Sequence, residues 1–177
     1  MDERITQIES EIPRLRRYAR YLTRDADQAD DLVQEALMRS IAKIHTWQPG
    51  TNLRAWLFVI LRNAYISEVR RANRAPTDSA VAEDHPGLAV AGGHEMRIAL
   101  VELRQAFDTL SAEHREVLHL VAVEGLKYEE AAEVLEIPVG TVRSRLSRAR
   151  TALRLRLEGE VIEEEPDRVL DQEQGVS

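Results

Sequence analysis

A segment in the second half of the chain, LKYEEAAEVLEIPVGTVRSRLSRARTALR, constrains the fold more than any other. Its first part carries the small residues Ala131 and Ala132, where a second helix has room to cross closely. Pro138 then interrupts the helical pattern, because proline cannot continue a helix but suits the start of the next one. The segment therefore predicts two helices, about 128–135 and 139–157, joined by a tight turn as a helix-turn-helix.

The second of these helices has two chemically different sides. Its apolar residues recur at helical spacing and are expected to face a core: Val142, Leu146, Ala149 and Leu153. The opposite side holds only guanidinium and hydroxyl groups: Arg143, Ser144, Ser147, Arg148, Thr151 and Arg154. Such a side fits the major groove of DNA, where arginine bridges guanine acceptors and neighbouring donors hold phosphate. The alternative is a solvated arginine-rich helix, which the helix-turn-helix spacing and the lack of any carboxylate on this side disfavour.

The composition of the chain favours a helical protein of the cytoplasm. Leu, Ala, Glu and Arg are frequent, while only 8 of 177 residues are glycine, which favours helices over sheets. The chain has no cysteine, which excludes disulfides and thiolate metal sites and indicates a reducing compartment. The start, MDERITQIES, is no secretory signal, and no apolar run approaches the roughly 20 residues of a membrane span.

Charge divides the chain into four parts. The net charge of −7 arises because residues 75–96 carry 4 acidic and no basic residues, and residues 157–177 carry 8 acidic and 1 basic. Residues 1–74 carry 13 basic and 10 acidic residues, and residues 97–156 carry 10 and 9. We therefore expect two small helical domains with a flexible linker and a disordered acidic tail, in the order 1–74, linker 75–96, 97–157, tail 158–177.

Helical periodicity predicts three helices in the first of these domains and four in the second. The expected ranges are about 8–22, 25–45 and 53–73, followed by 97–109, 113–123, 128–135 and 139–157. Pro49 and Gly50 break the chain before the third helix, and Thr51 or Asn52 is expected to cap it. The fold class predicted from these patterns is all-α.

The second predicted helix, ADDLVQEALMRSIAKI, also has a distinct outward side. Its inward side carries Leu32, Val33, Ala36, Leu37 and Ile44. Its outward side carries Asp31, Gln34, Glu35 and Met38. Two carboxylates, an amide and a soft apolar side chain are typical of a protein-binding surface. The spacing alone favours the alternative, an ordinary solvated side.

The third predicted helix, LRAWLFVILRNAYISEVRRANR, is apolar in its first half and ends in Arg70, Arg71 and Arg74. Six of the eight aromatic residues lie within residues 1–74. Aromatic rings and arginines together are what a protein uses to hold unpaired bases, by stacking and by phosphate contact. Most of the rings, Trp56 among them, are expected to pack in the core.

These motifs together resemble the small two-domain sigma factors of the extracytoplasmic-function group. The first half matches through DDLVQEAL, WQPGTNLRAWLFVILRN and the basic end EVRRANR, and the second through LKYEEAAEVLEIPVGTVRSRLSRAR. The resemblance covers about residues 8–74 and 97–157, with both motif sets in the family's order. The opening PRLRRYARYLTRDADQADDLVQEAL further resembles the general-stress-response subgroup of alphaproteobacteria.

The resemblance implies a transcription initiation factor that binds core RNA polymerase and promoter DNA. In the family the first domain binds the clamp helices of the largest polymerase subunit, and the DLVQE contact falls here on Asp31, Gln34 and Glu35, next to Met38. The loop before the third helix, together with Asn63, would hold a flipped-out base of the melted −10 element. That loop consists of Trp47, Gln48, Pro49, Gly50, Thr51, Asn52 and Leu53. The residues that would follow the phosphates are Arg62, Arg70, Arg71 and Arg74.

For the second domain the resemblance implies that the helix-turn-helix reads the −35 element as duplex DNA. Carried over by position, the contacts are Arg143, Ser144, Ser147, Arg148 and Arg150, with Arg154 on a phosphate. Ser147 departs from relatives that have a bulky aromatic residue there. The loop WQPGTN departs from the commoner FRG-type loop. Both departures leave the base preference at their element open.

The resemblance also implies a small helical anti-sigma factor as a partner. In the subgroup that protein holds the sigma factor inactive, and a phosphorylated response regulator with a sigma-like domain releases it by mimicry. The main alternative is a sigma-like decoy that binds an anti-sigma factor without touching DNA. A decoy normally accompanies a receiver domain and need not keep basic reading positions, so Arg143, Arg148 and Arg150 argue against it.

Two further classes of protein are disfavoured by the sequence. An ordinary regulator with this helix-turn-helix would not need the DLVQE and RN motifs of the first half. An enzyme is disfavoured because no Gly-rich phosphate loop or nucleophile constellation is present. His114 and His119, five residues apart, do not share a helix face as metal ligands would. We therefore expect no cofactor, no metal and no small-molecule substrate.

Overall fold

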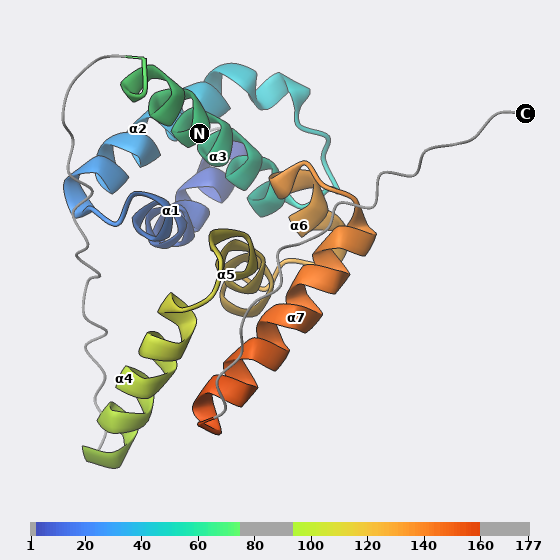
Figure 1. The fold of residues 1–177 in the computed structure, drawn as a ribbon. Coiled ribbons are helices and arrows are strands. Elements are labelled where there is room, and N and C mark those ends of the chain that lie inside the picture. Colours follow the sequence, from blue (N-terminus) through green and yellow to red (C-terminus); the bar gives the residue numbers. More distant parts are fainter. Residues whose placement is uncertain (1–2, 75–93, 160–177) are drawn as a thin grey trace, which may run out of the picture.

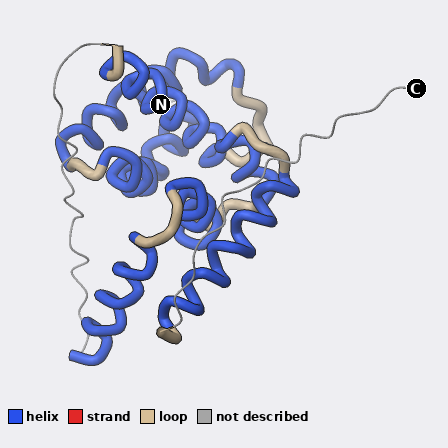
Figure 2. The backbone as a smooth tube through the Cα atoms, in the orientation of Figure 1, coloured by secondary structure: helices blue, strands red, loops and turns tan. Residues whose placement is uncertain are grey.

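The computed structural model describes residues 3–74 and 94–159, and both parts are built of helices (Figure 2). We call residues 3–74 the first domain and residues 94–159 the second domain. The all-α class predicted from the sequence is confirmed, since the described residues contain no strand. The expected linker over 75–96 and tail over 158–177 lie almost wholly outside the described residues.

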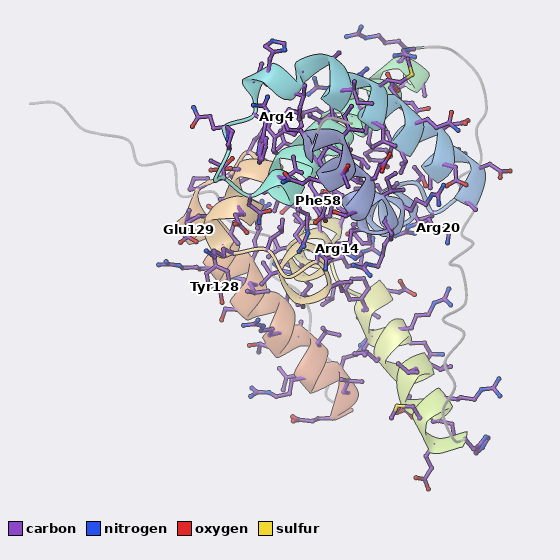
Figure 3. The ribbon with its side chains drawn as sticks, turned by 180° about the vertical axis from the view of Figure 1, so that it is seen from behind. Arg4, Arg14, Arg20, Phe58, Tyr128 and Glu129 are labelled. Atoms are coloured by element: carbon purple, nitrogen blue, oxygen red, sulfur yellow. The ribbon has the colours of Figure 1, made fainter. Side chains whose placement is uncertain are left out.

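The first domain is a bundle of three helices (Figure 1). They are α1 (Glu3–Thr23), α2 (Ala26–Lys43) and α3 (Leu53–Ala72), with the 3-10 turn η1 (Ile44–Thr46) after α2. The apolar sides predicted from periodicity meet at the centre, where Leu15, Leu32 and Phe58 are fully buried. Figure 3 labels Phe58 inside this bundle, with Arg14 and Arg20 on α1 nearby. Leu37 and Ile44, also expected inside, are half-buried at its edge.

Two side chains start the helices of this bundle. The Asp25 carboxylate accepts a hydrogen bond from the Gln28 amide at 2.8 Å and caps α2. The Asn52 side-chain oxygen accepts from the Arg54 amide at 3.0 Å and caps α3. Both caps satisfy backbone donors that the first turn of a helix leaves free. Of the two residues expected to cap α3, the structure therefore selects Asn52.

The second domain contains four helices, one of which changes its winding. They are α4 (His94–Asp108), α5 (Ala112–Leu118) continued by the π-helical turn η2 (His119–Val123), α6 (Tyr128–Leu135) and α7 (Val139–Leu157). The first of them begins at His94, inside the range expected for the linker. The helix predicted over 113–123 is present, but its second half is wound as a π-helix, in which the Glu124 amide donates to the His119 carbonyl five residues back, at 3.0 Å. One wide turn of this kind leaves the apolar spacing nearly unchanged, so the sequence did not reveal it.

The predicted helix-turn-helix is formed by α6 and α7. Helix α6 ends at Glu136, which is left-handed with φ of 57°. Pro138 is then the N-cap of α7, and its carbonyl accepts from the Thr141 amide at 2.9 Å. Val142 and Leu146 are buried against the rest of the domain, so the expected inward side of α7 is confirmed.

The two domains pack against each other, with α3 lying beside α6 (Figure 1). The buried apolar residues of both domains form one continuous cluster. Helix α4 and the C-terminal end of α7 project away from the first domain, and their side chains are largely open to solvent (Figure 3).

Two further features bear on function. Across the described parts of the chain, no helix combines the length and apolar character needed to cross a bilayer. No group of three or more His, Asp or Glu side chains in these parts is arranged to hold a metal ion.

Candidate nucleic-acid and polymerase interface

The predicted DNA-reading side of α7 is exposed. The exposed residues are Arg143, Ser144, Ser147, Arg148, Arg150, Thr151 and Arg154. Arg143 lies 3.9 Å from the Glu129 carboxylate of α6, and both side chains are mostly open to solvent. Arg145, which the sequence did not assign to DNA, is half-buried and pairs with Glu113 of α5 at 2.9 Å. The structure thus separates an arginine that ties α7 to its own domain from those that face outward.

The predicted polymerase-binding side of α2 is also open. Asp31 and Gln34 are exposed, and Met38 is 73% exposed. Glu35 is half-buried and forms an ion pair with Arg39, one turn further along the helix. Ile41 is 50% exposed and extends the apolar part of this side beyond the predicted residues.

The loop between η1 and α3 folds into a tight turn. Its exposed residues are Gln48, Pro49, Gly50, Thr51 and Asn52, between buried Trp47 and half-buried Leu53. Gly50 has φ of +94°, a conformation that a residue with a side chain rarely adopts. The Thr51 hydroxyl donates to the Gln48 carbonyl at 2.7 Å and closes the turn. The Trp47 indole nitrogen is buried without a hydrogen-bond partner within the described residues, so Trp47 supports the loop from inside.

The remaining predicted −10 residues are spread along α3. Asn63 is exposed, and Arg70, Arg71 and Arg74 are exposed at the far end. Ten residues of helix separate Leu53 from Asn63, a distance of about 15 Å at 1.5 Å per residue. The loop and Asn63 are therefore set apart along α3, and their shared role at the −10 element stays a prediction.

A cluster of charged side chains that the sequence did not predict joins the two domains. Arg17 of α1 binds the Glu124 carboxylate through two hydrogen bonds, at 2.6 Å from Nε and 2.8 Å from Nη2. Arg54 of α3 donates to the Glu124 carbonyl at 3.1 Å. The Glu124 side chain is completely buried, and burial alone raises its pKa. The hydrogen bond from Arg17 and the neighbouring His119 outweigh burial and hold the pKa of Glu124 below its ordinary value.

A second carboxylate, that of Glu116 on α5, is held in the same way. The Glu116 carboxylate accepts from the Arg62 Nε and from the Tyr18 hydroxyl, both at 2.9 Å. Burial, together with the Glu116 charge, raises the pKa of Tyr18 well above its ordinary value, so the hydroxyl remains a donor. Arg62, predicted to follow a DNA phosphate, is therefore occupied by a carboxylate of the second domain in this arrangement.

A histidine completes the contact between the domains. His119, in η2, stacks on Tyr21 of α1 with 4.3 Å between ring centroids and 16° between planes. Its second neighbour is Tyr18, at 5.7 Å, and its Nε2 lies 3.4 Å from the Glu124 carboxylate. The π-helical turn widens the helix at this point and carries the histidine and the carboxylate to the same side.

No pattern in the sequence predicted these interdomain residues. Arg17 and Glu124 are 107 positions apart, and Tyr18 and Glu116 are 98 apart. Arg17 and Glu116 lie in helices whose periodicity explains them as ordinary polar positions. Only the packing of α5 and η2 on α1 brings them together.

Comparison with known proteins decides the family. The family model for the sigma2 domain of PhyR matches residues 8–62, and that for region 4 of sigma-70 matches residues 100–153. The extracytoplasmic-function (ECF) RNA polymerase sigma factor EcfG of Rhodopseudomonas palustris is 44% identical over 142 residues, which are 80% of this chain and 78% of that protein. The chain belongs to the ECF sigma factors. The resemblance inferred from its motifs is confirmed.

Other relatives and solved structures agree with this assignment. The ECF sigma factor SigC of Mycobacterium tuberculosis is 37% identical over 140 residues, which are 77% of this sigma factor and 74% of that one. The sigma factor RpoE from Bartonella quintana, solved in complex with the anti-sigma factor NepR, superposes with a TM-score of 0.69 at 33% identity. That match covers 89% of this chain and 98% of RpoE. The PhyRSL–NepR complex from Sphingomonas sp. Fr1 shares the fold, with a TM-score of 0.65 at 20% identity.

Proposed function

We propose that this sigma factor binds core RNA polymerase and directs it to promoters by reading the −35 element with α7 and capturing the melted −10 element with the first domain. The observation that carries the proposal is the outward side of α7, on which the exposed residues are arginines, serines and a threonine. A helix of this kind, set in a helix-turn-helix, matches the way such domains enter the major groove. Arg143, Arg148 and Arg150 are the proposed base-edge and phosphate contacts nearest the turn.

The polymerase contact is proposed for the outward side of α2. Asp31, Gln34 and Met38 are exposed there beside Glu35, and this combination of carboxylates and apolar surface suits a protein partner. The same helix buries Leu32 on its other side, so the outward residues can change without disturbing the core.

The −10 contact is proposed for the loop over 47–53 and the exposed polar residues of α3. The turn at Gly50 presents backbone and small polar side chains, which suits recognition of an unpaired base. Asn63, Arg70, Arg71 and Arg74 continue along α3 in the direction that a single strand would follow. Arg62 joins them only when the second domain releases it.

An anti-sigma factor is proposed as a further partner. RpoE, at 33% identity, was solved in complex with the anti-sigma factor NepR. Both domains of the present chain expose apolar side chains at which a helical partner could pack. These are Met38 and Ile41 on α2, and Met96, Ile98, Val101 and Leu103 on α4.

The decoy interpretation has one observation in its favour, since the family model that matches the first half is that of the sigma2 domain of PhyR. A decoy would bind an anti-sigma factor but would not support transcription. The outward arginines of α7, which a decoy does not need, favour the sigma factor. The test below separates the two.

The deciding experiment is in vitro transcription with core polymerase on a promoter library, with and without this protein. We expect transcripts from a subset of promoters only when the protein is present. The variant Asp31→Arg/Glu35→Arg should bind core polymerase more weakly and lose these transcripts, while Glu9→Arg/Glu68→Arg makes the same charge change at exposed sites on α1 and α3 and should not. Absence of any dependent transcript would refute the proposal and favour the decoy. Unchanged polymerase affinity of the α2 variant would refute the assigned side.

A further inference from the structure

In the arginine contacts between the domains, the first domain supplies the hydrogen-bond donors and the second domain supplies the acceptors. Arg17, Arg54 and Arg62 of the first domain donate to oxygen atoms of the second, and the acceptors are the carboxylate and carbonyl of Glu124 and the carboxylate of Glu116. The first domain thus presents guanidinium groups, and the second presents anionic or partly negative oxygens. Arginine binds carboxylate and phosphate with the same fork of donors.

The stacked rings at this contact have the geometry of a base stacked on a tyrosine. His119 lays a flat, nitrogen-containing ring on Tyr21 at 4.3 Å between centroids, almost parallel to it. A nucleic-acid base stacks on tyrosine in the same geometry, and stacking tolerates any base because each has a π face. The ring and the two carboxylates all come from the short stretch of α5, η2 and the residue after it.

We infer that Arg17, Tyr21 and Arg62 form a surface for single-stranded nucleic acid, and that the second domain covers this surface with groups that stand in for the strand. We call these three residues the covered surface. Glu116 and Glu124 occupy phosphate positions, and His119 occupies the position of a base. The inference extends the proposed function, because it assigns Arg17 and Tyr21 to the captured strand and makes the packed arrangement a state that the strand must displace.

The physical consequence is competition within one molecule. The Arg17 side chain stays 49% exposed in the packed arrangement. Arg17, Tyr21 and Arg62 can nevertheless engage a strand together only in molecules whose domains have separated, so its apparent affinity falls in proportion to the separated fraction. The Glu124 side chain is fully buried and its charge is balanced chiefly by Arg17. Removing the charges of Glu116 and Glu124 weakens the cover without altering the covered surface itself.

The test uses the full chain and a fluorescent single-stranded DNA of about 12 nucleotides, a length that one binding surface spans. The variant Glu116→Gln/Glu124→Gln keeps side-chain size but removes both charges. We expect it to bind the oligonucleotide at least about fivefold tighter than the unaltered chain in fluorescence anisotropy, because more molecules are open. Adding Arg17→Ala and Tyr21→Ala to this variant should remove the gain, because those side chains form the surface.

The matched control is Glu113→Gln/Glu133→Gln. It removes two carboxylates from the same domain, and both side chains are exposed on the domain's own surface, with Glu113 paired to Arg145 of that domain. Its net charge equals that of the test variant, so it measures the general effect of charge on DNA affinity. An equal gain in the control would overturn the inference.

Domain separation is measured independently. The chain has no cysteine, so Gln28→Cys and Gln105→Cys on exposed positions of α2 and α4 accept a pair of dyes for energy transfer. Transfer should fall in the test variant and on adding oligonucleotide to the unaltered chain. If transfer does not fall in the variant, the carboxylates do not hold the domains together. If transfer falls but affinity does not rise, the contact is domain packing alone. Either result overturns the inference.

One further measurement and one milder variant distinguish these outcomes from a failure of the double variant to fold. Thermal melting followed by circular dichroism shows whether the double variant folds, and Glu116→Gln alone provides a smaller change with the same expected direction. The assay contains neither polymerase nor promoter. A failure of the proposed function, seen as no dependent transcription, is therefore distinct from a failure of this inference.

Discussion

At the scale of single residues, Tyr18 joins the core of the first domain to the second domain. Its ring is fully buried and stacks on Phe58 with 4.9 Å between centroids. Its hydroxyl donates to Glu116 at 2.9 Å. One side chain therefore carries both an apolar contact within a domain and a polar contact between domains, and these can be separated by a conservative change.

Replacing Tyr18 by Phe should lower the free energy of unfolding by about 1–2 kcal/mol, because a hydrogen bond to a carboxylate is lost while the ring remains. Chemical denaturation measures the change. The control is Tyr21→Phe, which keeps the ring that stacks on His119. Equal stability of Tyr18→Phe and the unaltered chain would show that the hydroxyl contributes nothing to the contact.

Glu124 should make the domain contact sensitive to acid. Its pKa is lower in the folded chain than in the unfolded one, where a glutamate titrates near 4.3. Its contribution is therefore complete at neutral pH and is lost as pH falls through the folded value. Energy transfer between dyes at positions 28 and 105 should fall as the pH drops below the ordinary range of a glutamate. The same titration of Glu124→Gln should lack this component; an identical acid transition in both proteins would contradict the assignment.

At the scale of elements, the turn of the helix-turn-helix contains a residue under backbone strain. Glu136 is exposed and left-handed, with φ of 57°. A left-handed residue with a side chain costs roughly 1–2 kcal/mol relative to the right-handed form. The position is the C-cap of α6, where glycine is the commonest choice in proteins.

The change Glu136→Gly should raise the free energy of unfolding by about 0.5–1 kcal/mol, since relief of strain exceeds the added entropy of the unfolded chain. Glu133→Gly, inside α6, should instead lower it by about 1 kcal/mol. Thermal melting of the two variants gives the sign of each effect. A destabilised Glu136→Gly would mean that the glutamate side chain makes a contribution larger than the strain.

The outward arginines of α7 should divide into base readers and phosphate contacts. Arg148→Ala should cost about 1–3 kcal/mol at a cognate −35 duplex and relax preference at one base pair, as expected for a bidentate contact. Arg154→Ala, near the end of the helix, should weaken binding evenly across sequences and lower the salt dependence. Anisotropy on a set of single-substitution duplexes distinguishes them. Equal, sequence-independent losses would remove Arg148 as a reader.

At the scale of the whole molecule, the packed arrangement leaves apolar surface open on both domains. Met38 is 73% exposed on α2, and Leu103 is 42% exposed on α4. A single helical partner that covers both places gains from linkage, because its second contact forms at high effective concentration. The proposed anti-sigma factor would then clamp the two domains together.

Met38→Asp and Leu103→Asp should each weaken binding of the anti-sigma factor, and the double variant should weaken it more than either alone. Burying an unpaired carboxylate in place of an apolar side chain costs several kcal/mol at most interfaces. Isothermal titration with the purified anti-sigma factor measures the three affinities, and Gln105→Asp, exposed on α4, is the control. If one single variant reproduces the loss of the double, inhibition acts through one domain.

The sequence by itself determined the approximate ranges of the helices, the two candidates for the cap of α3 and the sides that face outward. Those features depend on residues a few positions apart, such as Asp25 with Gln28, so periodicity and capping rules reach them. It also carried both motif sets, and through them the family. That Asn63 and the loop meet the −10 element together stays a prediction, because spacing along a chain does not fix distance in the folded structure.

Only the tertiary structure decided how the two domains meet. Arg17 and Glu124, Arg62 and Glu116, and Tyr21 and His119 are each pairs from different domains, and nothing in their local sequence distinguishes them from solvated polar positions. Two arginines that a sequence reader assigns to solvent or to DNA are instead bound to buried or half-buried carboxylates. A contact of this kind depends on the orientation of two separately formed helical units, and that orientation is set by the surfaces that remain after each unit has buried its own apolar side.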